Sequence, residues 1–156
     1  MKTQQSLLIF ISILLLSSCS IFRKAIPDNR TLQEKVESKS FTIAISHSNP
    51  SNLRDSYLGN DVEVRMKNDS IFANLPFFGV ANTAPMDQND GGINIEKPMK
   101  DFLIKQNSQS GWNLIFKVNT SQYKYVFRVD IDNQGKAIVF VTSTERSPMT
   151  YYGEVQ

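Results

Sequence analysis

Apolar and polar residues alternate along most of the chain from Lys39 onward. A period of two is typical of β-strands that bury one face and expose the other. The apolar positions of the clearest runs are Phe41, Ile43 and Ile45; Val62, Val64 and Met66; Trp112, Leu114, Phe116 and Val118; Tyr123, Tyr125, Phe127, Val129 and Ile131; and Ala137, Val139 and Val141. The pattern predicts about eight or nine strands and no long interior helix.

Short polar segments rich in turn-forming residues separate these runs. They lie at residues 67–70, 108–111, 119–122 and 132–135. Links of this length permit only antiparallel hairpins, so residues 100–144 are predicted to form a four-strand meander. We expect residues 31–156 to form one all-β domain, an antiparallel meander that closes into a lipocalin-like barrel. A two-sheet β-sandwich uses the same alternation and is the alternative.

One short helix is predicted before the first strand. Thr31 and Glu34 have the spacing of a capping box, in which each side chain accepts a hydrogen bond from a free N–H of the first turn. Leu32 and Val36 would then share one face. A helix over residues 31–38 is too short to be stable alone, so it must pack against the body.

Several apolar residues break the alternation on the central strands. They are Ile115, Val126, Ile138 and Phe140, and they fall on the face that is otherwise polar. We therefore expect these strands to be covered on both faces, with the N-terminal helix as the candidate cover.

The first residues have the composition of an export signal. Lys2 precedes an apolar segment at residues 6–16, which as a helix spans about 16 Å, about half the apolar core of a bilayer. Cys19 follows Leu-Ser-Ser, a sequence that resembles the bacterial lipobox. We therefore assign residues 1–18 to a lipoprotein signal peptide and residues 19–30 to the lipid anchor and tether. An ordinary secretory signal that happens to contain a cysteine is the alternative.

The expected location follows from this signal. A lipidated Cys19 would hold the protein on a membrane, because two or more acyl chains give stable anchoring. No acidic run follows Cys19. This favours a cell-envelope protein on the outer membrane that faces the periplasm over one displayed at the cell surface.

Composition excludes several classes of function. The 17 Lys and Arg residues nearly balance 15 Asp and Glu residues, whereas nucleic-acid binders normally carry a strong basic excess. One His and one Cys cannot form a tetrahedral zinc site, and one Cys cannot form an internal disulfide. No cofactor is expected.

Catalytic and metal-binding patterns are incomplete. His47 is the only imidazole, and on a regular strand Ser46 and Ser48 would point to the opposite face from it. No catalytic residue is therefore assigned. The Asp130-x-Asp132 segment begins like a calcium loop, but Val141 stands where the bidentate Glu is required, so we expect a hairpin turn. Residues 87–92 form a second acidic segment with the composition of an ordinary loop, and no metal is expected there.

Three segments carry a family resemblance. They are Leu75-Pro76-Phe77-Phe78-Gly79, then Ala84-Pro85 with Gly91-Gly92-Ile93, and finally Glu145-Arg146-Ser147-Pro148-Met149-Thr150-Tyr151-Tyr152-Gly153. In this order, behind a lipoprotein signal, they resemble the DUF4251 family of Bacteroidetes lipoproteins over most of the predicted domain. Phe77 stands where the family usually has Tyr, so a hydroxyl there is not essential. The family has no known function, so the resemblance implies the fold and the location but no reaction.

The same segments provide the candidate binding residues. Phe77 and Phe78 follow a strand and could line the mouth of a barrel, joined by Arg146 and Tyr151 of the terminal motif. The structural alternative is that an aromatic ring plugs the barrel end, that Gly79 supplies a positive φ and that Arg146 pins a loop.

We expect a non-enzymatic, lipid-anchored binding module for a small apolar ligand or a protein partner. A hydrolase that acts on envelope glycan or lipid is the alternative.

Overall fold

The computed structural model describes residues 30–50, 56–81, 91–107 and 110–156. Their elements are helix α2 (Leu32–Glu37) and strands β1 (Ser40–Pro50), β2 (Ser56–Tyr57), β3 (Glu63–Lys67), β4 (Ser70–Pro76), β5 (Gly92–Pro98), β6 (Lys100–Gln106), β7 (Trp112–Asn119), β8 (Lys124–Ile131), β9 (Lys136–Ser143) and β10 (Met149–Val155). The signal segment, Cys19, the tether up to residue 29 and the acidic residues 87–90 lie outside the described residues.

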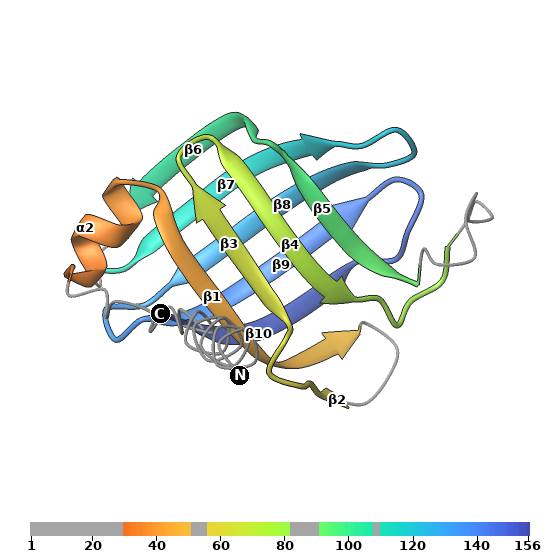
Figure 1. The fold of residues 1–156 in the computed structure, drawn as a ribbon, viewed down its shortest axis with the longest axis horizontal. Coiled ribbons are helices and arrows are strands. Elements are labelled where there is room, and N and C mark those ends of the chain that lie inside the picture. The colour runs from red at the N-terminus through yellow and green to blue at the C-terminus, as the bar shows by residue number, and fades with distance from the viewer. Residues whose placement is uncertain (1–29, 51–55, 82–90, 108–109) are drawn as a thin grey trace, which may run out of the picture.

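The strands form one antiparallel sheet that curls into a nearly closed barrel (Figure 1). Its hydrogen-bonded order is β5-β4-β3-β1-β10-β9-β8-β7-β6, and β2 is added to β1. The barrel has one seam, between β5 and β6, the two ends of this strand order. These strands follow one another in the chain with only Met99 between them. The predicted barrel is therefore confirmed over the two-sheet alternative, and strands β6 to β9 form the meander expected for residues 100–144.

Strand β1 holds the two halves of the sheet together. Its first half pairs with β3 on one edge, while β10, the last strand of the chain, pairs along its other edge. The β1–β10 register places Ile45 opposite Gly153 and His47 opposite Tyr152, so Ser46 is an extra residue in a β-bulge. Gly153 is required there because a Cβ would lie 2.2 Å from the carbonyl oxygen of Ala44.

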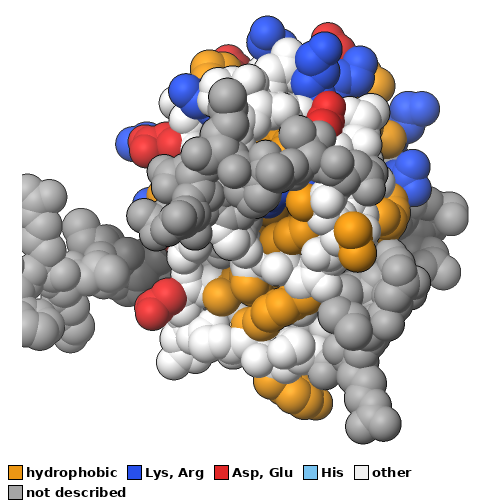
Figure 2. Space-filling view, turned by 90° about the vertical axis from the view of Figure 1, so that its right-hand side faces the viewer, with side chains coloured by type: hydrophobic (Ala, Val, Ile, Leu, Met, Phe, Trp, Pro, Cys, Tyr) orange, Lys and Arg blue, Asp and Glu red, His pale blue; other side chains and the backbone are white. Residues whose placement is uncertain are grey.

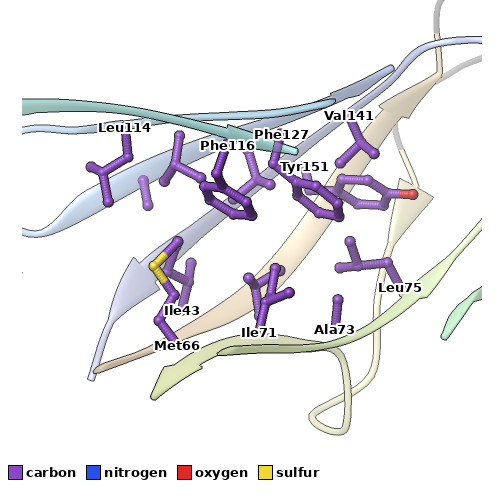
Figure 3. Packing of buried hydrophobic residues seen from close by; sticks show 14 of the residues in the cluster. Ile43, Met66, Ile71, Ala73, Leu75, Leu114, Phe116, Phe127, Val141 and Tyr151 are labelled. Atoms are coloured by element: carbon purple, nitrogen blue, oxygen red, sulfur yellow. The ribbon is translucent and has the colours of Figure 1, made fainter. Parts of the chain in front are cut away.

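Alternating side chains of both walls fill the barrel interior and point toward one another (Figure 3). The rings of Phe116 and Phe127 stack with centroids 5.2 Å apart, and Phe102 lies 6.0 Å from Phe116 on the other side. Phe116, Phe127 and Tyr151 have no solvent-accessible surface. A cavity large enough for water would give the side chains around it such a surface, so the interior at these positions is filled.

Helix α2 closes one end of the barrel (Figure 1). Thr31 and Glu34 form the predicted capping box, and Val36 is fully buried while Leu32 packs against the core, so the predicted short helix is confirmed. The helix does not cover the outer face of the central strands. Val126 and Ile138 are 38% and 42% exposed there, so the expected second cover is wrong for the described residues. The helix has only six residues, and its one apolar face packs into the barrel end. It therefore has no second apolar face that could cover the outside of the sheet.

The close approach of β1 and β10 gives a stability prediction. Gly153→Ala is expected to lower the free energy of unfolding by about 2 kcal/mol or more, because the new Cβ would force the two strands apart. Gly59→Ala is the matched control, because no atom lies within 4 Å of the Cβ it adds, and it should stay within about 0.5 kcal/mol of wild type. Urea unfolding followed by the fluorescence of Trp112 measures both. Equal stability of the two variants would contradict the steric argument.

Candidate functional site

The residues singled out in the Leu-Pro-Phe-Phe-Gly and terminal motifs lie at the barrel end away from α2. Figure 2 faces this end, where hydrophobic side chains gather in the middle and lysines and arginines lie toward the upper part. Three of the four candidates, Phe77, Arg146 and Tyr151, are packed into the structure here, while Phe78 is 39% exposed.

Arg146 is a buried cation that ties this end together. Its side chain donates a hydrogen bond to the carbonyl oxygen of Gly92 at 2.7 Å. Its guanidinium carbon lies 4.1 Å from the ring centroid of Tyr123 and 5.0 Å from that of Phe77. A guanidinium between two aromatic faces is held by cation–π attraction as well as by the hydrogen bond. Arg146 thus connects the β9–β10 link to β5 and to the segment after β4.

Tyr151 contributes a second internal contact. Its hydroxyl donates to the carbonyl oxygen of Pro76 at 2.7 Å, and burial raises the pKa of its phenol, so the group stays a neutral donor. Gly79 is needed for space, not for a positive φ: a Cβ would lie 2.7 Å from the Phe77 ring and 2.9 Å from Ser147. The expectation that Gly79 supplies a positive φ is therefore wrong, because the position needs glycine for lack of space. A ligand role for the four candidate residues stays a prediction.

A different hollow lies on the outside of the barrel. It is an open groove of about 1090 Å³ across the outer surface of β1, β2, β8, β9 and β10 and the segment between β2 and β3. Its lining residues are Thr42, Ala44, Ile45, Ser46, His47, Tyr57, Leu58, Asn60, Glu63, Asp130, Asp132, Lys136, Ala137, Ile138, Tyr152, Gly153, Glu154 and Gln156. The four candidates Phe77, Phe78, Arg146 and Tyr151 do not line this groove, whereas Tyr152 and Gly153 of the terminal motif do.

The β1 bulge explains why the groove is aromatic. His47 pairs in register with Tyr152 on one side and with Tyr57 on the other. The rings of His47 and Tyr152 stack in parallel with centroids 4.6 Å apart, and Tyr57 lies 6.0 Å from His47. Tyr57 is 89% exposed, so a large aromatic ring is held in the groove with most of its surface in solvent.

The bulge also corrects one expectation about His47. Ser46 does not point away from it: Ser46 Oγ lies 3.0 Å from His47 Nδ1 and donates to the carbonyl oxygen of Tyr152 at 3.1 Å. Ser48 is fully buried on the opposite face, as the alternation predicts. A bulge places two successive residues on one face, which a strict period of two cannot show.

Carboxylates line the groove, but the described residues contain no group of three His, Cys, Asp or Glu side chains arranged to hold a metal ion. Glu63 is paired with Arg65, and Asp130 accepts a hydrogen bond from the Asn113 amide. The Asp132 carboxylate accepts hydrogen bonds from the backbone N–H groups of Gln134 and Lys136. This segment is therefore the hairpin turn that was predicted in place of a calcium loop. Over the described ranges, no helix has the length and apolar character needed to cross a membrane.

Tyr151 gives a prediction for high pH. Its folded pKa lies above the ordinary value of about 10, so its stabilising contribution is complete below that pH and is lost as the pH rises and the unfolded phenol ionises. Tyr151→Phe should cost about 1 kcal/mol at neutral pH through the lost hydrogen bond. It should also flatten the fall in the free energy of unfolding above pH of about 10. Urea unfolding of both proteins across this range is the measurement, and parallel pH profiles would contradict the assignment.

Comparison with known proteins identifies the family. A family profile described as "Domain of unknown function (DUF4251)" matches residues 24–155. The crystal structure of a DUF4251 family protein from Bacteroides eggerthii DSM 20697 superposes with a TM-score of 0.63 at 14% sequence identity, over 79% of this chain and 83% of that one. No functionally curated protein matches the chain. The barrel and the motifs at its end therefore belong to a member of the DUF4251 family.

Proposed function

We propose that the protein is a lipid-anchored component of the cell envelope that binds a protein partner on the outside of its barrel and catalyses no reaction. The observation that carries this proposal is the contrast between the two surfaces of the sheet. The inner face is filled by the protein's own side chains, whereas the outer face is hollowed over β1, β2, β8, β9 and β10 and exposes an aromatic ring.

The filled interior argues against the form of the hypothesis in which a small apolar ligand lies inside the barrel. Lipocalin-like carriers need an interior cavity of several hundred Å³. Here Val36 lies at one end, and Arg146 and Tyr151 make internal contacts at the other. A ligand of useful size would have to displace these side chains.

The anchor part of the proposal comes from the lone cysteine. Cys19 stands directly after Leu-Ser-Ser, eleven residues before Arg30. A chain of that length spans at most about 40 Å, so the barrel would stay close to the membrane that holds the lipid. An outer-membrane position that faces the periplasm remains our proposal for the location.

The groove contains only some of the residues that the alternative function, a hydrolase, would need. His47 and several carboxylates line it, but the Ser46 hydroxyl, 3.0 Å from His47 Nδ1, also lies 3.1 Å from the Tyr152 carbonyl oxygen, which competes for its proton. A serine nucleophile needs its base to accept the hydroxyl proton. This arrangement supports the non-enzymatic proposal.

The anchor is tested by Cys19→Ala. This variant should accumulate as an uncleaved precursor that is not labelled by radioactive palmitate, because the thiol is the acylation site. Wild type and Val80→Ala, a change at an exposed residue of the barrel, should both be labelled and found with the membranes. Palmitate labelling and normal processing of the Cys19→Ala variant would refute the anchor.

The outside position of the binding surface is tested with cis-parinaric acid, a fluorescent fatty acid that interior-binding barrels take up. The wild-type protein should show no saturable uptake at micromolar concentrations, because no interior space is available. Saturable uptake that is insensitive to Tyr57→Ala but lost on enlargement of an interior side chain, as in Ala73→Phe, would place the ligand inside and overturn the proposal.

A further inference from the structure

The groove contains a row of side chains that crosses five strands. The pairing registers place Tyr57 of β2, His47 of β1, Tyr152 of β10, Ile138 of β9 and Asp130 of β8 directly side by side. All five line the groove. Adjacent strands are about 4.8 Å apart, so the row is about 19 Å long, the length of about six residues of extended peptide.

The row changes character from one end to the other. Tyr57 forms an exposed aromatic end, and Ile138, 42% exposed, is an apolar step between Tyr152 and the carboxylate of Asp130. An aromatic face attracts cations, an aliphatic surface takes the hydrocarbon stem of a lysine or arginine, and a carboxylate binds its charged end.

The charges of the groove have one sign in excess. Four carboxylates line it against one lysine. Glu63 is paired with Arg65, and Glu154 lies opposite Lys136 in the strand register. Within the part of the chain that the structure describes, the hydrogen bonds to the Asp130 and Asp132 carboxylates come from neutral amide groups, which do not neutralise their charge. Counted with these partners, the groove lining keeps two carboxylates in excess, and both lie at the end of the row opposite Tyr57.

We propose that this row binds an extended segment of a partner protein that carries lysine or arginine, with the basic group at Asp130 and Asp132 and the aliphatic stem over Ile138. This inference rests on the proposed function and specifies the chemistry of the partner. Charge complementarity selects a basic segment over an acidic one and over a neutral glycan.

The chain carries its own reporters for the test. His47 is the only histidine and lies in the row, and Trp112 is the only tryptophan and lies in the barrel core. The full lipidated protein is held in octaethylene glycol dodecyl ether, a detergent with neither charge nor sugar. NMR then follows the His47 ring signal and the Trp112 indole N–H signal. The probes are the capped peptides Lys-Leu-Lys-Leu-Lys and Glu-Leu-Glu-Leu-Glu, and chitotriose as a neutral glycan.

The lysine peptide should shift the His47 signal saturably, leave the Trp112 signal in place and bind more weakly as salt is added. Asp130→Asn and Tyr57→Ala should each raise its dissociation constant about threefold or more, the change expected for one exposed charge or cation–π contact. Leu103→Ala, at a residue 58% exposed on β6 outside the groove, should leave it unchanged.

Three results would overturn the inference. They are an equal response to the glutamate peptide, a response to chitotriose alone, and a lysine-peptide response that Asp130→Asn does not change. A chitotriose response that Tyr57→Ala weakens would reject the basic partner yet keep binding on the outside of the barrel. Fatty-acid uptake inside the barrel is the separate result that would remove the proposed function itself.

Discussion

The structure depends on the pairing of β1 with β10. The chain forms two runs of neighbouring strands, β3 to β5 and β6 to β10, and neither run closes a barrel by itself. Strand β1 is long enough to pair with β3 along one edge and with β10 along the other, so it joins the two runs into one sheet. The single seam then falls between β5 and β6, at the buried Met99.

The same pairing produces the candidate site. The strands approach closely at Gly153, and the extra residue Ser46 lets β1 bulge at that point. The bulge turns His47 outward between Tyr57 and Tyr152, which creates an aromatic row on a face that would otherwise be polar. The fold thus concentrates its packing on the inner face and leaves the aromatic row exposed on the outer face. For this reason we propose a protein partner on the outer face and not a small molecule carried inside the barrel.

Local patterns in the sequence predicted the local structure. The alternation of Trp112 to Ile131 and the short polar links determined the meander, because strand faces and hairpins depend on neighbouring residues. The capping box of Thr31 and Glu34 located α2 for the same reason. The family motifs led to Phe77, Arg146 and Tyr151, which the structure places at one barrel end, where each makes internal contacts.

Long-range features were missed for an equally physical reason. No local sequence pattern indicates that the first strand pairs with the last. The groove on the outer face of these two strands therefore cannot be predicted from the sequence. The bulge at Ser46 broke the period that placed His47 and Ser46 on opposite faces, and Gly153 gave a signal only as an unexplained glycine in a strand. Ile138 is the one residue of the groove that the sequence pattern singles out, because it is apolar on an otherwise polar strand face. The expected explanation, that a helix covers this face, is wrong.

The β1 bulge holds His47 outside the barrel within the aromatic row. A nuclear Overhauser spectrum that observes the ring protons of His47 measures this directly. We expect cross-peaks from His47 to the rings of Tyr152 and Tyr57 and to the β-protons of Ser46. Cross-peaks from the His47 ring to interior methyl groups such as those of Ile43 or Val64 would instead place the ring inside the barrel and rule out the outward bulge.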